Sequence, residues 1–195
     1  MKILYLGPES PIADYVRDDG NNVLRYEGKN LEAAMDEMDW VDWLVSYRYR
    51  YIVPRGVLDY FYGRTVNLHT SLLPYNRGTH PNFWSWIDDT PKGVSLHRMW
   101  PGLDTGPIYA NAVLLFENCD FSFHDTYEIL DREIVHLFKR YWPRIADEWQ
   151  LPVLQVGSFT YHRTADLERM RFCLPEGWDT PINVALELLR TDVLV

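Results

Sequence analysis

The feature that most constrains the fold is an alternation of short apolar runs and helix-spaced segments in the first third of the chain. The predicted elements are strands at residues 1–7, 23–26, 43–46 and 66–69 and helices at residues 12–17 and 31–38. Strands that alternate with helices favour a parallel sheet with helices packed over its faces. We therefore expect an α/β fold with a mostly parallel sheet.

The second half of the chain continues the sheet in a different way. A helix is predicted at residues 81–87, and strands at 94–99 and 108–116 flank a glycine-containing loop, which is typical of an antiparallel pair. The clearest helix follows. Ser122 and Asp125 resemble a capping box at its start, and apolar spacing continues until Pro143 is expected to end it.

These patterns predict one main domain over residues 1–149. Residues 150–195 read as an appendage of short strands and helices without an independent core. The long helix over residues 122–141 could form a homodimer face, but the same spacing fits simple core packing. A homodimer is therefore one of two open interpretations.

Charge and composition restrict the class of partner and the compartment. The 195 residues carry a formal net charge of -9, which disfavours binding to nucleic acid but allows a small basic pocket for a phosphate. Cys119 and Cys173 lack metal-type spacing and are interpreted as buried thiols in a reducing compartment. No run approaches the ~20 apolar residues of a membrane helix. We expect a cytoplasmic protein that contacts no membrane.

Several common catalytic motifs are missing from the sequence. The first strand is followed by Gly7 alone, where a dinucleotide fingerprint needs three glycines. The sequence contains no phosphate loop, no His-Glu-x-x-His pair and no Gly-x-Ser-x-Gly elbow. We therefore expect neither a nicotinamide cofactor nor a metal ion.

One group of polar residues does suggest chemistry. Asn67 and His69 lie two apart on a predicted strand, so their side chains point to the same face. Asp104 follows in the glycine-flanked run Gly102-Leu103-Asp104-Thr105-Gly106. Residue types and spacing alone leave two interpretations open, a catalytic group and a set of ordinary structural polar residues.

Longer sequence motifs in the same region resemble those of a known family. The run Asn67-Leu68-His69-Thr70-Ser71-Leu72-Leu73-Pro74, then Arg77-Gly78, then Leu103-Asp104-Thr105-Gly106, resembles the formyltetrahydrofolate-dependent formyltransferases. That family acts on methionyl-tRNA, glycinamide ribonucleotide and nucleotide-linked amino sugars, and it includes a deformylase. Residues 46–54 and 76–84 look most like the sugar-acting branch. The resemblance implies a Rossmann-like fold and N10-formyltetrahydrofolate as co-substrate.

The resemblance also implies roles for individual residues. Asn67 would hold the formyl oxygen and stabilise an oxyanion, His69 would steer the amine, and Asp104 would orient His69 and help remove a proton. Folate would lie beside residues 51–53 and the loop of residues 99–104, and backbone groups there would make most of the contacts with its pterin. Those cofactor-contact candidates are Tyr51, Ile52, Val53, Met99, Trp100, Gly102 and Leu103. A plain exit from strand to turn is the alternative interpretation of residues 52–54.

Acceptor contacts are expected on the segment that follows the first motif. Arg77 could anchor its loop internally or face the acceptor. His80, Asn82 and Trp84 could contact the acceptor or pack the start of a helix. Residues 161–163 also resemble the tails of sugar-acting members, although a solvated turn explains them equally well.

Two departures from the family bear on function. Asn67 comes early, so the first half is expected to lack one strand–helix unit, and no C-terminal barrel is recognisable. The favoured acceptor is a primary amine of a nucleotide-linked amino sugar. The alternatives are glycinamide ribonucleotide, methionyl-tRNA, water (as in a deformylase) and a folate-binding module without catalysis.

Overall fold

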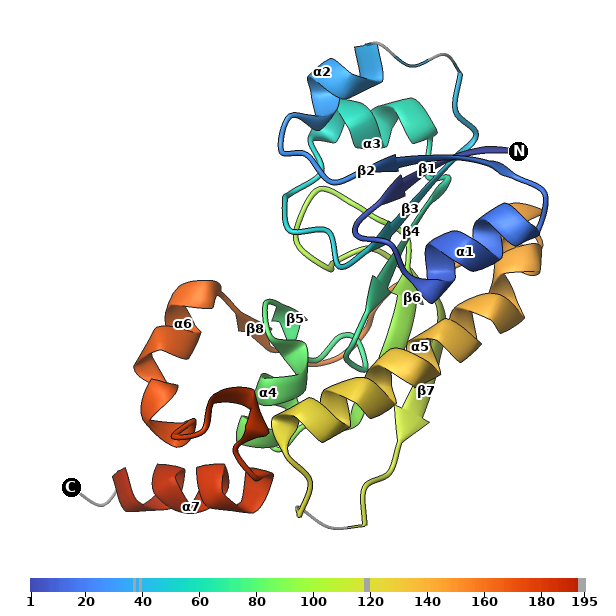
Figure 1. The fold of residues 1–195 in the computed structure, drawn as a ribbon. Coiled ribbons are helices and arrows are strands. Elements are labelled where there is room, and N and C mark those ends of the chain that lie inside the picture. The colour runs from blue at the N-terminus through green and yellow to red at the C-terminus, as the bar shows by residue number, and fades with distance from the viewer. Residues whose placement is uncertain (37, 39, 118–119, 193–195) are drawn as a thin grey trace.

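A computed structural model describes residues 1–36, 38, 40–117 and 120–192. A six-stranded sheet forms its centre, in the order β2-β1-β3-β4-β6-β7 (Figure 1). The strands are β1 (Lys2–Leu6), β2 (Asn22–Tyr26), β3 (Trp43–Tyr47), β4 (Thr65–His69), β6 (Lys92–His97) and β7 (Ile108–Leu114). The first four are parallel, while β6 runs antiparallel to both β4 and β7. The predicted mostly parallel sheet with one antiparallel pair is confirmed.

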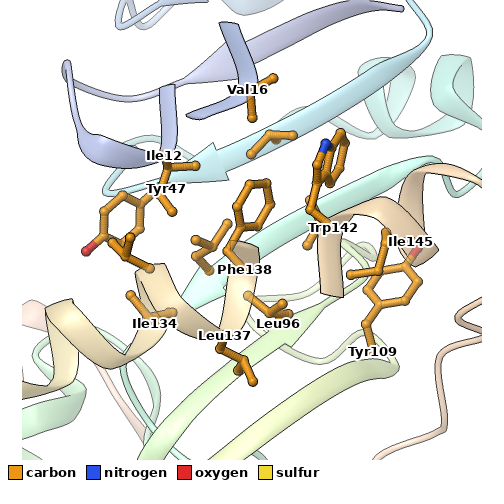
Figure 2. Close-up of a cluster of buried hydrophobic side chains, with 14 of the residues drawn as sticks. Ile12, Val16, Tyr47, Leu96, Tyr109, Ile134, Leu137, Phe138, Trp142 and Ile145 are labelled. Atoms are coloured by element: carbon orange, nitrogen blue, oxygen red, sulfur yellow. The ribbon is translucent and has the colours of Figure 1, made fainter. Parts of the chain in front are cut away.

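Helices cover both faces of this sheet. One face carries α1 (Pro11–Asp18) and α5 (Phe123–Ala146), and the other carries α2 (Leu31–Asp36) and α3 (Arg55–Phe61) (Figure 1). Figure 2 shows the core on the α5 face, where Phe138 and Trp142 stack with their ring centroids 5.1 Å apart. Val66 and Leu68 of β4 belong to that core. Because side chains alternate along a strand, Asn67 and His69 point to the opposite face.

Helix α5 begins with a capping box and contains a proline in its last turns. The capping box of Ser122 and Asp125 is present, as predicted. The expectation that Pro143 ends the helix is wrong, because α5 continues to Ala146. A proline inside a helix has no N–H to offer the carbonyl four residues earlier. Here Tyr15 of α1 donates its hydroxyl to that carbonyl, the Lys139 oxygen, at 3.3 Å.

The C-terminal segment packs against the end of the sheet near α4 (Pro81–Ile87). Its elements are β8 (Tyr161–His162), α6 (Thr164–Arg169), 3₁₀ turns at Arg171–Cys173 and Gly177–Asp179, and α7 (Ile182–Asp192). Strand β8 pairs in parallel with the short strand β5 (Arg77–Gly78). A third hydrophobic cluster joins α4 to α6 and α7. This segment therefore reaches back to the loop that follows β4 (Figure 1).

Cys173 is fully buried, whereas Cys119 lies outside the described residues. Helix α5 turns its apolar face to the sheet, which is the core-packing interpretation of its spacing. In the described part of the chain, no helix combines the length and apolar character needed to cross a membrane.

Candidate active site

The structure brings Asn67, His69 and Asp104 together on the sheet face that α5 does not cover. Asn67 donates from Nδ2 to Asp104 Oδ1 at 3.3 Å, and His69 Nδ1 lies 3.6 Å from Asp104 Oδ2. Strand β4 supplies the first two residues, and the loop between β6 and β7 supplies the third. Side chains that are 37 residues apart in sequence thus form one polar cluster.

Asp104 occupies an unusual backbone conformation at the centre of this cluster. Its φ of 53° lies in the left-handed region, which Asp tolerates better than most residues. The side chain is only 8% exposed, and the backbone N–H of Gly78 donates to Oδ2 at 2.9 Å. The loop therefore turns the carboxylate inward, towards β4 and β5.

Asp104 is held in its charged form. Burial alone would raise its pKa, but the nearby His69 and His97 rings and the Gly78 N–H together lower the pKa well below 3.8. The carboxylate is therefore ionised throughout the physiological range. It can stabilise positive charge on a neighbouring imidazole.

His97 is a member of this cluster that the sequence did not reveal. It ends β6 directly opposite Asn67, and its Nε2 lies 3.1 Å from Asn67 Nδ2 and 3.3 Å from Asp104 Oδ1. Its Nδ1 lies 2.8 Å from the Arg98 carbonyl oxygen, which can only accept, so Nδ1 carries the hydrogen. Neutral His97 then accepts from Asn67, whereas charged His97 can only donate to Asp104.

A hydrogen bond to a backbone carbonyl also sets the tautomer of His69. Its Nε2 lies 3.0 Å from the carbonyl oxygen of Asn76 and therefore carries a hydrogen. In the neutral ring the lone pair is then on Nδ1, beside Asp104. His69 can accept a proton at Nδ1, and the Asp104 carboxylate stabilises the charge that results.

Exposed apolar side chains lie on the two segments where folate contacts were predicted, and we call these side chains the apolar rim. Tyr51 is 41% exposed, Ile52 80%, Trp100 45% and Leu103 40%. Val53 and Met99 join the two segments through one hydrophobic cluster on the α2–α3 face. Gly102, with a φ of 117°, makes the turn between Trp100 and Leu103. These side chains could cover a flat aromatic ring system.

Arg77 is placed as an internal anchor. Its guanidinium donates to Gln155 Oε1 from Nε at 3.1 Å and from Nη2 at 2.7 Å, and it lies over the Phe159 ring. Burial lowers its pKa, while Asp104 acts in the opposite direction. Of the two interpretations left open for Arg77, the contacts fit the anchor.

The other three predicted acceptor contacts lie in or beside the packing around α4. Asn82 is buried and donates to the Phe123 carbonyl oxygen at 2.8 Å, which ties α4 to α5. Trp84 is buried and stacks on His162 with centroids 3.8 Å apart. His80 stacks on Trp178, and burial followed by the charge of Arg171 lowers its pKa. The contacts of Asn82 and Trp84 favour packing over acceptor binding.

The fold and the cluster together define a class of protein. It is an α/β protein with a Rossmann-like sheet, in which an Asn, a His and an Asp converge and two nearby segments of the chain expose apolar side chains. Among the described residues, no group of three or more His, Cys, Asp or Glu side chains could hold a metal ion.

Comparison with known proteins identifies the family within that class. The family described as "Formyl transferase" matches residues 19–140. The chain belongs to this family of formyltransferases. The match covers β2, β3, β4, β6 and β7 of the central sheet and most of α5.

A solved relative resembles the chain over almost its whole length. The formyltransferase PseJ from Anoxybacillus kamchatkensis is 36% identical, with a TM-score of 0.89, over 95% of this chain and 97% of its own. Its structure is described as a complex with UDP-4,6-dideoxy-4-formamido-L-AltNAc and tetrahydrofolate. A likely sugar N-formyltransferase from Mycobacterium tuberculosis shares the fold at 22% identity, with a TM-score of 0.76, over 87% of this chain and 78% of its own.

Curated relatives match a shorter part of the chain. GDP-perosamine N-formyltransferase from Brucella melitensis is 34% identical over 49% of this chain and 38% of its own length. Methionyl-tRNA formyltransferase from Finegoldia magna is 28% identical over 67% of this chain and 42% of its own. The chain thus spans less than half the length of these curated relatives.

Proposed function

We propose that this protein transfers a formyl group from N10-formyltetrahydrofolate to the primary amine of a nucleotide-linked amino sugar. The observation that carries the proposal is the end-to-end similarity to PseJ, whose complex contains a formamido sugar linked to UDP. A UDP-linked amino sugar is therefore the first acceptor to test.

The polar cluster supplies the groups that such a transfer needs. Asn67 would donate an amide hydrogen to the formyl oxygen and stabilise negative charge there. Its amide nitrogen now contacts His97 and Asp104, so one of these contacts must be exchanged for the formyl oxygen. His69 would accept the amine proton at Nδ1, and Asp104 would stabilise the imidazolium. The new bond joins the amine nitrogen to the formyl carbon, and the bond from that carbon to the folate N10 breaks. N10 takes up one proton as it leaves, which balances the proton that the amine gives to His69.

The apolar rim fits the carrier. A pterin is flat and largely aromatic, and it would lie between the segment of Tyr51 and Ile52 and the loop of Trp100 and Leu103. Covering these exposed side chains would remove them from water and bring the formyl carbon to Asn67. The proposed contacts thus remain those that the sequence predicted.

The choice of acceptor rests on charge as well as similarity. Transfer RNA carries many phosphates and rewards a basic surface, whereas this chain has a net charge of -9. Methionyl-tRNA formyltransferase from Finegoldia magna matches over 42% of its own length, whereas PseJ matches over 97% of its own. We therefore favour a small acceptor, and we expect the protein to act in the cytoplasm. The homodimer stays a prediction.

A competition assay tests the proposal. The protein is given N10-formyltetrahydrofolate with UDP-, dTDP- and GDP-linked amino sugars, glycinamide ribonucleotide, methionyl-tRNA, or no acceptor. Formylation of a sugar nucleotide above all other acceptors is the expected result. Formylation of methionyl-tRNA or glycinamide ribonucleotide alone would refute the sugar assignment. Equal folate release without any acceptor would instead identify a deformylase.

A further inference from the structure

A glutamine outside the predicted site holds the loop that carries Asp104. Gln155 lies in the segment between α5 and β8, and its Nε2 donates to the Asp104 carbonyl oxygen at 2.8 Å and to the Gly106 carbonyl oxygen at 2.7 Å. These two carbonyls stand on either side of Thr105. Both hydrogens of one side-chain amide are therefore used to fix two points of one short loop.

The other end of the same amide is also occupied. Gln155 Oε1 accepts two hydrogen bonds from Arg77, and Arg77 directly precedes Gly78, whose N–H binds Asp104 Oδ2. Asp104 is thus held at two points. Its carboxylate binds the Gly78 N–H, and its carbonyl oxygen is linked through Gln155 to Arg77, the residue before Gly78. These hydrogen bonds, with the Arg77–Gly78 and Asp104 backbone, form a closed ring.

The hydrogen bonds of this ring hold the loop that carries Asp104, and two features of that loop favour movement. Asp104 adopts a left-handed φ of 53°, and its neighbour Leu103 and nearby Trp100 are exposed to solvent. Although Asp tolerates this conformation better than most residues, it still costs free energy, and surrounding contacts offset that cost. Gln155 is partly buried, although Leu154 and Val156 on either side of it are exposed, so the chain turns this one side chain inward.

We propose that Gln155 is a positioning residue that sets Asp104 against His69 and His97 for the proposed formyl transfer. It does not touch the reacting atoms, and it acts through the Asp104 loop. The inference rests on the proposed function for its kinetic consequence, but the placement of Asp104 can be measured without turnover.

Two substitutions of Gln155 distinguish the role of its amide donor from that of its carbonyl acceptor. Gln155→Glu keeps the acceptor for Arg77 but replaces the donor with a carboxylate oxygen facing two carbonyl oxygens. Gln155→Met keeps a similar length and removes every polar atom without adding charge. Gln150 provides a matched control, because its Nε2 also donates to a core carbonyl, that of Tyr109 at 2.9 Å.

Steady-state kinetics give the first readout. Both Gln155 variants are expected to lose roughly 10- to 100-fold in kcat, the scale of a misplaced catalytic group, with a smaller change in KM. Gln150→Glu and Gln150→Met are expected to stay within about twofold of wild type. Wild-type kcat in both Gln155 variants would overturn the proposal, as would an equal loss in the Gln150 variants.

Carboxyl ¹³C NMR gives a second readout that is independent of activity. Opening the loop should take Asp104 away from His69, His97 and the Gly78 N–H, so Asp104 should titrate closer to its usual 3.8 in both Gln155 variants. The uncharged Met variant excludes a direct effect of the new Glu charge. An unchanged Asp104 titration in the Met variant would refute the positioning role.

The two readouts keep this inference apart from the proposed function. If wild-type protein formylates no acceptor, the proposed function fails, while the Asp104 titration still decides the role of Gln155. If Gln155→Glu unfolds at the assay temperature, Gln155→Asn carries the same test, because its amide is one methylene too short to reach both carbonyls.

Discussion

Asn67 and His97 face each other across the antiparallel pair of β4 and β6, with Asn67 Nδ2 3.1 Å from His97 Nε2. Because the His97 Nδ1 hydrogen is directed to a backbone carbonyl, the neutral ring offers Asn67 an acceptor. This contact orients the amide that is proposed to hold the formyl oxygen. The proton state of His97 therefore bears on the direction in which Asn67 donates.

Replacing Asn67 tests the amide directly. Asn67→Ala should lower kcat by roughly 10²-fold or more, the usual scale for loss of an oxyanion donor. Asn111→Ala is the control, since Asn111 is an exposed asparagine on β7. Steady-state kinetics with formyltetrahydrofolate and the best acceptor measure both. A kcat equal to wild type in Asn67→Ala would show that the amide is not used.

Replacing His97 tests the contact that the sequence did not predict. His97→Leu should lower kcat roughly tenfold and raise the pKa of Asp104, because His97 is one of the groups that hold that carboxylate ionised. His97→Gln should retain more activity, since its oxygen can still accept from Asn67. His136→Gln on the exposed side of α5 serves as control. Equal activity in His97→Leu and wild type would remove His97 from the site.

Asp104 should make stability depend on pH in a defined direction. Its folded-state pKa lies below the unfolded value of 3.8, so its contribution is complete above about pH 5 and is lost as pH falls through the folded-state pKa. Urea unfolding should show Asp104→Asn less stable than wild type by about 1–3 kcal/mol at pH 7. The difference should be smaller at pH 3. A difference that grows on acidification would contradict the assigned shift.

The end of α5 offers a test of the fold. Tyr15→Phe removes the donor to the Lys139 carbonyl and should lower the free energy of unfolding by about 1 kcal/mol. In the Pro143→Ala background the helix supplies its own N–H, so the same substitution should cost less. Thermal or urea unfolding of the four proteins gives the coupling. Identical costs in both backgrounds would show that Tyr15 does not compensate for the proline.

The sequence predicted those features whose signals are local. Alternating apolar runs gave the parallel strands, and the spacing of Asn67 and His69 gave their common face. Helix α3 was missed because seven residues after Pro54 carry too little periodicity to stand out. The β5–β8 pair was missed because two-residue strands carry no pattern and the partners lie far apart in sequence.

The missed site residues share one cause. His97 is close to Asn67 only through the register of β4 and β6, and Gln155 meets Asp104 across 51 residues. Nothing local to either residue marks it, since a histidine at a strand end and a glutamine in a tail are common. The register of two strands, and contacts between residues far apart in sequence, are set only in the folded molecule.

Transfer of a labelled formyl group tests the central claim most directly. N10-formyltetrahydrofolate labelled with ¹³C in the formyl group is incubated with a UDP-linked amino sugar, and ¹³C NMR follows the label. We predict a new formamide carbon on the sugar with wild-type protein, and at least 10²-fold slower formation with Asn67→Ala. A label found only in free formate, or sugar formamide formed equally fast with Asn67→Ala, would contradict formyl transfer to the sugar by way of Asn67.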